Sequence, residues 1–370
     1  MKLTVERNAF LKALSHGHSV VERRTTLPIL SHILLSADGV NIKMTATDLE
    51  LSIVESVSAI VKEPGKTAVP AHMLHDIVRK FPDGCSILME LDKANNHLHI
   101  SSGKSNFNLP CLPAEDFPAI NTVDLPHKFK ISAKKLLHLI ERTKFAMSTE
   151  ETRYFLNGIY MHIHGDNELR AAATDGHRLA RASMPLPEGA KGMPGIIISR
   201  KTVAEISKLL TDCPDGLEVS VSENQICFKM LTAVLTARLI DGKYPNYEDA
   251  IPSANSNIVY LHIKPFSQAV DRVATISASE KTPGIRAIIK DGKITLSAAN
   301  NNSGNADEEI EIEYQGDDVD IGFNSRYLLD VAQQIDGEEA QILMSDGASP
   351  VIIKSSNDDS ALYVLMPMRV

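Results

Sequence analysis

"FKISAKKLLHLI" (residues 129–140) joins a short β-like run to a run whose apolar side chains have helical spacing. The same order recurs in "LTVERNAFLKAL" (3–14) and in "LHIKPFSQAV" (261–270). Each stretch predicts a β-strand that leads directly into a helix. Similarity at a fixed spacing, here roughly 125 to 130 residues, is typical of a chain made of repeated units.

The segments that follow correspond as well. Each unit continues with a strand, a turn at D-G or G-D-N, a second strand and a polar corner, and these segments span residues 27–53, 154–180 and 282–312. A second helical pattern then follows in every unit, at residues 70–81, 199–210 and 324–335.

Many predicted strands alternate apolar and polar residues, as "NIKMTAT" (41–47) does, so each sheet has one buried face and its strands are antiparallel. Each unit thus has two helices and about eight strands, with the helices packed on the sheets. The predicted class is α+β in three repeated domains. Turn-rich segments place their limits at 1–125, 126–253 and 254–370.

Composition limits the class of protein. The chain has 370 residues, 43% hydrophobic residues and no Trp, so several cores of aliphatic side chains are expected. The N-terminus lacks the apolar core of a signal sequence, and no apolar run approaches about 18 residues. The four cysteines, Cys85, Cys111, Cys213 and Cys227, form no C-x-x-C pair, which favours reduced, mostly buried thiols in a cytoplasmic protein.

Charge is unevenly distributed along the chain. The formal net charge is −9, which by itself argues against a nucleic-acid-binding protein. The six helical stretches nevertheless have a combined formal charge of +8, so the rest of the chain carries −17. The charge of each stretch is +2 for residues 6–24, +1 for 71–80, +3 for 133–148, +2 for 199–211, +1 for 264–275 and −1 for 324–336. If equivalent helices lie on one side of a curved array, its inner face is basic and could face DNA.

Several ordered motifs extend over essentially the whole chain. They are "TLPIL" (26–30), "TDLE" (47–50), "RYFLNG" (153–158), "TDGHRLA" (174–180), "YPNY" (244–247), "IGFNSRYLLD" (321–330) and the terminal "MPMRV" (366–370). With these motifs the sequence closely resembles the bacterial DNA polymerase III beta subunit family, the sliding clamps. The resemblance implies three similar domains per chain and a head-to-tail homodimer that forms a six-domain ring around duplex DNA.

The resemblance also implies a function without catalysis. Such a ring binds DNA without sequence preference and tethers the replicative polymerase, so it acts as a processivity factor in the cytoplasm at the nucleoid. The implied partners are duplex DNA, a second copy of the chain, the polymerase alpha subunit, the clamp loader, and other polymerases and repair proteins. No cofactor and no metal site are expected.

Matching the family's motifs assigns a pocket for short linear peptides, shared by several partners. Polarizable Met side chains suit a pocket that accepts different sequences, and Arg side chains suit carbonyl or acidic groups. Glu248, Asp249 and Pro350 depart from the family pattern and bear on which peptides bind best. The implied pocket residues are Leu156, Thr174, Gly176, His177, Arg178, Leu179, Pro245, Val364, Met366, Pro367, Met368 and Arg369.

The resemblance places Arg24, Tyr154 and Phe155 next to the duplex. Helix charge alone adds further candidates for DNA contacts: Lys134, Lys135, Arg142, Lys144, Arg200, Lys201, Lys208 and Arg272.

For the dimer interface, the stretch 101–110 reads as an edge strand and an acidic run follows residue 306. A basic, apolar edge that faces an acidic edge would fix the orientation of two chains. An exposed edge strand made safe by its charges is the other interpretation. The candidate interface residues are Lys104, Phe107, Leu109, Ile276, Asp307, Glu308, Glu309, Glu311 and Glu313.

Two other functions fit parts of the sequence. Asp175, His177 and Arg178 lie within four residues and could serve a hydrolase or a transferase, although no phosphate loop or nucleophile motif lies near them. A repeat scaffold that never binds DNA is the other alternative. The alternating histidines at 16–18, 97–99 and 162–164 are more typical of wet strand faces than of metal ligands.

Overall fold

The computed structural model describes the chain except residues 24, 120–124, 214–215 and 301. Within the described part there are six α-helices, two in each predicted repeat. They are α1 (Arg7–Val20), α2 (Ala71–Lys80), α3 (Ala133–Lys144), α4 (Arg200–Thr211), α5 (Ile263–Ala274) and α6 (Ser325–Ala332). None of these helices is long and apolar enough to cross a membrane.

The strands follow the same threefold pattern, with eight in each predicted repeat of the described chain. The first eight are β1 (Lys2–Glu6), β2 (His32–Asp38), β3 (Asn41–Thr47), β4 (Leu51–Glu63), β5 (Gly65–Pro70), β6 (Ser86–Asp92), β7 (His97–Ser102) and β8 (Ser105–Pro110). The next eight are β9 (His127–Ile131), β10 (Gly158–His164), β11 (Glu168–Thr174), β12 (Arg178–Pro185), β13 (Ile196–Ser199), β14 (Leu217–Val221), β15 (Gln225–Lys229) and β16 (Ala233–Arg238). The last eight are β17 (Asn257–His262), β18 (Gly284–Lys290), β19 (Lys293–Asn300), β20 (Gly304–Glu311), β21 (Val319–Asn324), β22 (Glu339–Met344), β23 (Val351–Ser355) and β24 (Ala361–Leu365).

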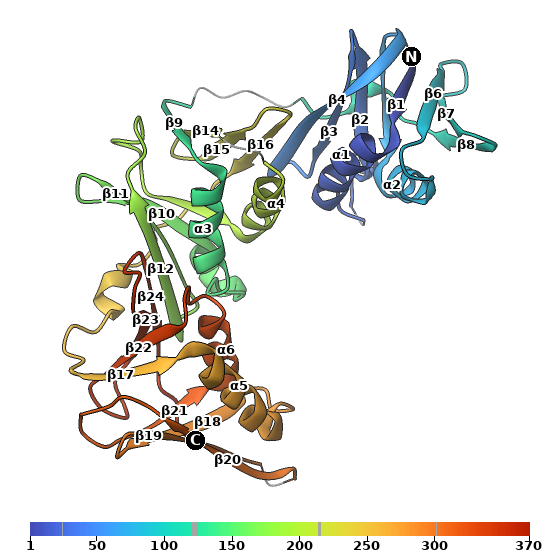
Figure 1. Cartoon of the computed structure of the whole chain (residues 1–370). Helices are drawn as coiled ribbons and strands as arrows, with labels where there is room; N and C mark the ends of the chain where they lie inside the picture. Colours follow the sequence, from blue (N-terminus) through green and yellow to red (C-terminus); the bar gives the residue numbers. More distant parts are fainter. Residues whose placement is uncertain (24, 120–124, 214–215, 301) are drawn as a thin grey trace. The chain divides into compact units, whose positions relative to one another are not determined.

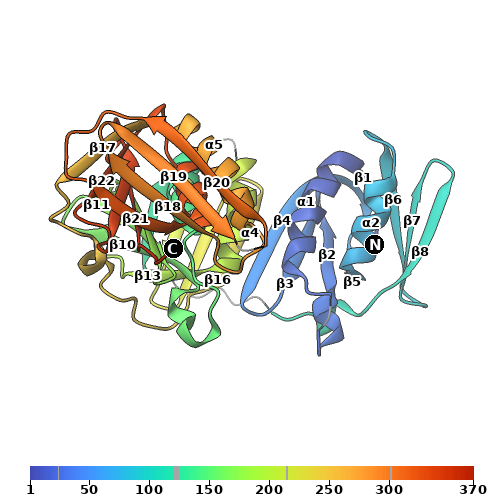
Figure 2. The same ribbon diagram turned by 90° about the horizontal axis from the view of Figure 1, so that it is seen from below.

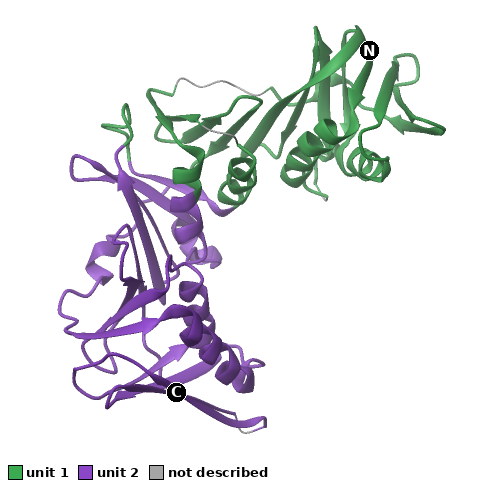
Figure 3. Cartoon of the chain, in the orientation of Figure 1, with its two compact units in different colours: residues 1–137, 187–194, 201–239 green, residues 138–186, 195–200, 240–370 purple. Residues whose placement is uncertain are grey.

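The chain packs as two compact units, coloured separately in Figure 3. Unit 1 holds residues 1–137, 187–194 and 201–239, and unit 2 holds the rest of the described chain. Two strand pairings explain why the division passes through the central repeat. β16 pairs with β4 in unit 1, whereas β12 pairs with β24 in unit 2. The predicted domain limits therefore describe the sequence repeat, and they stay a prediction.

Every strand pairing between named strands is antiparallel, as the alternation predicts. Unit 1 contains a 12-stranded sheet with the path β8-β7-β6-β1-β4-β16-β15-β14-β9. Unit 2 contains an eight-stranded sheet in the order β13-β10-β11-β12-β24-β23-β22-β17 and a four-stranded sheet in the order β20-β19-β18-β21. β8 and β20 are thus edge strands, each with one strand partner within the described chain.

Helix α1 shows how sequence fixes one of these elements. The Glu6 carboxylate accepts hydrogen bonds from the backbone N–H groups of Asn8 (2.9 Å) and Ala9 (2.8 Å), which begins the helix and lowers the pKa of Glu6. Phe10, Leu14 and Val20 are buried on one helix face. Figures 1 and 2 show α1 and α2 side by side over strands of the same sheet. The apolar face of α1 therefore closes the core of the first repeat.

The four cysteines are free thiols, as predicted, but only Cys111 is buried. The expectation that most of them are buried was wrong, because Cys85, Cys213 and Cys227 are only half-buried.

Candidate binding site at the T-D-G-H-R turn

The stretch 174–178 is a tight turn between β11 and β12, and its polar side chains hold the turn itself. Asp175 Oδ1 accepts from the backbone N–H groups of His177 (2.9 Å) and Arg178 (3.0 Å). Thr174 Oγ1 donates to the Arg178 carbonyl (2.6 Å) and accepts from Gly176 N–H (3.1 Å). Gly176 has φ of +89°, a conformation that glycine adopts without strain. The Asp and Thr side chains thus replace the backbone hydrogen bonds that a sharp turn leaves unmade.

Arg178 anchors the turn to other segments of unit 2, which contribute Phe145 and Asp330. Its guanidinium donates to Asp175 Oδ2 (3.1 Å), to the Phe145 carbonyl (2.7 Å) and to the Asp330 carboxylate. The same group lies over the rings of Phe145 (5.1 Å to the centroid) and Tyr327 (4.3 Å). Only 11% of its side chain is exposed. Arg178 is therefore a structural cation here, and most of its donors are already used.

An apolar cluster lies beneath the turn. Leu156, Leu179 and Val364 are buried in it, together with Ala172, Ile197, Tyr244, Tyr247 and Ile352. Half-buried apolar side chains, among them Phe155, Tyr160 and Leu362, pack against it. The Tyr244 hydroxyl accepts a hydrogen bond from Thr174 N–H (3.1 Å), which joins the cluster to the turn. Pro245, next to Tyr244, is exposed.

The C-terminal tail leaves β24 beside the turn. Met366 N–H donates to the His177 carbonyl (2.9 Å), and the side chain of Met366 is 43% exposed. Pro367 is half-buried. Met368 N–H then donates to the Gly322 carbonyl (2.9 Å).

The structure thus divides the predicted pocket residues into two places. Leu156, Leu179, Val364 and the turn lie together with Met366. Met368 and Arg369 instead line a separate surface pocket of about 450 Å³, together with Arg286 and Asp307.

The catalytic alternative lacks the necessary arrangement. Both oxygens of Asp175 are engaged by the turn and by Arg178, so its carboxylate orients no imidazole. His177 is exposed, and its ring has no hydrogen bond to any residue that the structure describes. An acid–base pair that activates a nucleophile is therefore not formed at this turn.

The predicted DNA contacts differ in how free their side chains are. Arg24 lies outside the described residues. Lys134 and Lys135 are exposed on α3 and form no ion pair with a described residue. Tyr154 is 53% exposed, and its ring meets the half-buried Phe155 edge-on at 5.7 Å.

The other helix cations that were predicted to contact DNA are engaged within the chain. Arg142 is buried, pairs with Asp336 and donates to the Tyr363 hydroxyl (3.3 Å). Arg200 donates to the carbonyls of Met147 (2.7 Å) and Ser148 (2.5 Å). Ion pairs hold four others, Lys144 to Glu141, Lys201 to Asp48 and Glu22, Lys208 to Glu205, and Arg272 to Glu308.

The predicted interface residues lie on or beside the edge strands β8 and β20. On β8, Phe107 is 39% exposed and Leu109 is buried, while Lys104 is exposed in the preceding turn. On β20, Asp307, Glu309 and Glu311 are exposed. Glu308 is half-buried and paired with Arg272, and Ile276 is half-buried in the segment after α5. Glu313, just beyond β20, is exposed and forms an isolated bridge with Tyr260.

Sequence reasoning missed the residues that surround Arg178. Tyr327 and Asp330 come from α6, about 150 positions away in the sequence. Both belong to the motif "IGFNSRYLLD", so the motif match was the available signal, but spacing alone does not connect it to the turn.

Comparisons with known proteins agree along the whole chain. Family models of the DNA polymerase III beta subunit match residues 1–121 (N-terminal domain), 130–246 (central domain) and 248–369 (C-terminal domain). The beta sliding clamp of Caulobacter vibrioides is 48% identical over 373 residues, and that of Escherichia coli K12 is 35% identical over 371 residues. Both alignments cover 100% of each chain.

Solved structures give the same result for the fold. The Caulobacter crescentus beta sliding clamp superposes with a TM-score of 0.96 at 47% identity, covering 100% of this chain and 99% of the other. The Bartonella birtlesii sliding clamp bound to griselimycin also has a TM-score of 0.96, at 44% identity with full coverage of both chains. The repeat, the fold and these matches establish that the chain belongs to the DNA polymerase III beta subunit family, the bacterial beta sliding clamps.

Proposed function

We propose that two copies of this chain close head to tail into a ring around duplex DNA and carry the replicative polymerase along it. As a beta sliding clamp, the chain acts in DNA replication and is itself not an enzyme. DNA, a polymerase and a second copy of the chain are its general partners. The observation that carries the ring is that an open edge strand lies in each unit, β8 in unit 1 and β20 in unit 2.

Pairing of β8 with β20 of a second copy would both hold the two chains together and fix their relative orientation. The free backbone groups of two edge strands complete one continuous sheet across the interface. Lys104 and Phe107 give the β8 edge a basic and apolar character, whereas Asp307, Glu309 and Glu311 make the β20 edge acidic. The basic β8 edge attracts the acidic β20 edge, whereas two edges of the same charge repel each other, so the contact is heterologous. Such a contact closes into a ring when the rotation from one chain to the next allows it.

The ring retains DNA by enclosure, with weak electrostatic contacts to the backbone. Lys134 and Lys135 are the best-supported contacts, because they are exposed and unpaired among the described residues. Weak and screened contacts to phosphates position the duplex while they permit sliding. Tyr154 and Phe155, and Arg24 on resemblance alone, complete the proposed set.

The turn at 174–178 and the apolar cluster beneath it are the proposed docking site for short linear peptides. Half-buried Phe155, Tyr160 and Leu362 supply apolar contact, and the exposed Met366 supplies an adaptable side chain. His177 and Pro245 border this surface. The assignments of Met368 and Arg369 to the site rest on the family resemblance alone.

The polymerase alpha subunit, the clamp loader, other polymerases and repair proteins would compete for this single site. The ring would work at the nucleoid, where its DNA is. The domain ranges 1–125, 126–253 and 254–370 remain our proposal for the three repeats.

A topological experiment tests the ring. The protein is loaded by a clamp loader onto nicked circular DNA, and the salt concentration is then raised. We expect the protein to remain on the circle, because enclosure is not screened by salt, and to leave once the circle is cut. Equal loss from the intact and the cut DNA would contradict a closed ring.

A further inference from the structure

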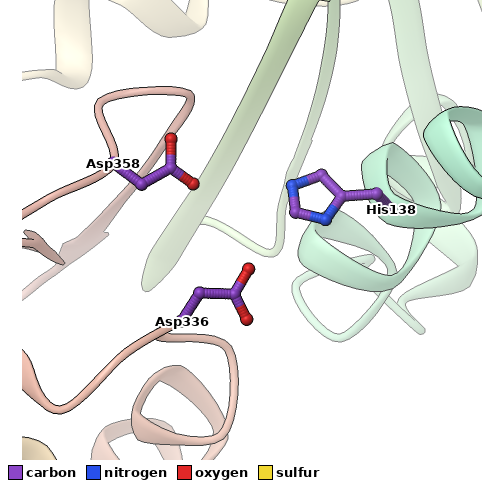
Figure 4. A group of neighbouring side chains, drawn as sticks. All are labelled: His138, Asp336 and Asp358. Atoms are coloured by element: carbon purple, nitrogen blue, oxygen red, sulfur yellow. The ribbon is translucent and has the colours of Figure 1, made fainter.

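Three potential metal ligands from distant segments converge in unit 2. His138 lies on α3, Asp336 follows α6, and Asp358 lies in the turn between β23 and β24. One ligand atom from each residue lies within 4.8 Å of the other two. Figure 4 shows the imidazole and both carboxylates directed into a common space. None of these residues belongs to the proposed docking, DNA or dimer surfaces.

Both carboxylates are held in place by neighbours that leave acceptor positions free. Asp358 accepts from Ser360 N–H (2.8 Å) and from the Ser360 hydroxyl (2.9 Å). Asp336 pairs with the buried Arg142, and its carbonyl accepts from the Ser355 hydroxyl (2.9 Å). Ionised carboxylates have about four acceptor positions, so one more ligand bond per group remains available. Outer partners of this kind orient metal ligands in known sites.

The charge of the cluster favours a cation. The carboxylates of Asp336 and Asp358 and the guanidinium of Arg142 together carry one formal negative charge beside the ring of His138. His138 has no hydrogen bond to any residue in the described part of the chain.

We propose that His138, Asp336 and Asp358 bind one divalent transition-metal ion, with water at its remaining positions. One imidazole nitrogen and two carboxylate oxygens suit Zn²⁺ or Mn²⁺, whereas Mg²⁺ prefers oxygen ligands alone. The ion would connect α3 of the central repeat to two loops of the C-terminal repeat. It would therefore brace the junction that the β12–β24 pairing forms inside unit 2.

Titration of the metal-free, full-length protein with Zn²⁺ tests the site. We expect one Zn²⁺ per chain by calorimetry and a rise in the melting temperature of about 5 °C at a hundredfold excess over Kd. His138→Gln and Asp358→Asn should each weaken binding at least about 10-fold, because loss of a ligand costs no less than loss of an outer partner. Two variants are used so that poor folding of one leaves the test intact.

The matched control is His164→Gln. His164 also lies beside a carboxylate in unit 2, with 3.2 Å between its Nδ1 and Glu248 Oε1, but it is outside the cluster. The control should keep the wild-type stoichiometry and affinity. If Zn²⁺ binds His138→Gln and Asp358→Asn as tightly as the wild type, or binds none of the proteins stoichiometrically, the site does not exist. Loading on circular DNA is a separate assay, so failure of the metal site leaves the ring untouched.

Discussion

At the scale of single residues, Arg178 shows how a cluster that resembles an active site serves as structure. The guanidinium lies over the rings of Phe145 and Tyr327 and has two carboxylates and a carbonyl as acceptors. Its charge is thus neutralised inside unit 2, and it holds the turn that borders the proposed docking site. The identity of these residues could be read from the sequence, but their role depends on acceptors that only the fold brings near.

Arg178→Ala should destabilise the chain strongly. The change leaves Asp330 and Asp175 without their partner and opens a space between Phe145 and Tyr327. Loss of one member of a largely buried pair costs about 3 kcal/mol. For a unit of this size that corresponds to a fall of about 6 to 12 °C in the unfolding temperature, measured by calorimetry.

Arg153→Ala is the matched control. Arg153 forms a comparable pair with Glu150, but 37% of its side chain is exposed. Its loss should cost about 0.5 kcal/mol. Similar losses for the two variants would show that Arg178 is no anchor of the turn.

Lys134 and Lys135 provide a second prediction for single residues. Lys134→Gln with Lys135→Gln should weaken DNA binding of the unloaded protein and reduce the slope of log K against log salt by about 2, since two phosphate contacts are lost. Lys144→Gln is the control, because Lys144 is already paired with Glu141. A slope that is unchanged in the double variant would remove these lysines from the DNA surface.

At the scale of elements, the end of α1 meets α2 through three histidine rings. The ring of His18 lies 4.4 Å from that of His72 and 4.4 Å from that of His75, centroid to centroid. Burial lowers the pKa of all three, and their mutual repulsion and the nearby Arg23 and Arg79 add to this, whereas Asp76 opposes it. The α1–α2 contact therefore depends on neutral imidazoles.

This contact should weaken in acid. A histidine in the unfolded chain takes up a proton near pH 6.5, whereas the three folded histidines do so only at lower pH. The stabilisation that the three neutral histidines give to the folded chain is therefore complete above about pH 6.5, and it is lost as the pH falls toward their pKa in the folded state. The unfolding temperature should thus fall as the pH is lowered from 7.5 to 5.5, and that of His72→Gln should fall less steeply than that of the wild type.

His99→Gln serves as the reference for that measurement, because His99 is exposed on β7. It should follow the wild-type curve. If the unfolding temperatures of His72→Gln and the wild type change with pH in the same way, the histidine contact does not contribute to the loss of stability in acid.

The elements themselves could be predicted well from the sequence, because their periodicity is local. The patterns at 70–81 and 199–210 became α2 (Ala71–Lys80) and α4 (Arg200–Thr211), and "NIKMTAT" became β3. The pattern at 324–335 extends past the end of α6 at Ala332. Arg142 could not be placed in the same way. On a helical pattern it reads as a solvated cation, but Asp336 and Tyr363 lie about 200 positions further along the chain.

At the scale of the whole molecule, the repeat and the packing follow different boundaries. Three repeats were evident in the sequence, yet the central one divides its strands between two units. Continuation of each sheet across a repeat boundary, by β4–β16 and β12–β24, buries polar backbone groups that would otherwise remain open edges. β8 and β20 are among the strands that end a sheet, as β9, β13, β17 and β21 also are. We propose β8 and β20 for the contact with a second copy because the β8 edge carries Lys104 and Phe107, whereas Asp307, Glu309 and Glu311 make the β20 edge acidic.

Phe107→Asp should therefore convert the dimer into monomers. The substitution places a negative charge on β8, where the proposed partner strand presents Asp307, Glu309 and Glu311, and it removes apolar contact from a side chain that is 39% exposed in the single chain. We expect dimerisation at least about 10-fold weaker, a loss of some 1.4 kcal/mol, and a halved mass by light scattering at low protein concentration.

Val40→Asp makes the same kind of change in the same unit, at a residue that is 72% exposed before β3, and it should remain dimeric. Because Phe107 also meets the ring of Phe81 at 5.7 Å, the unfolding temperature of each variant must be compared with that of the wild type. A folded Phe107→Asp protein that dimerises as tightly as Val40→Asp would place the interface elsewhere than on β8.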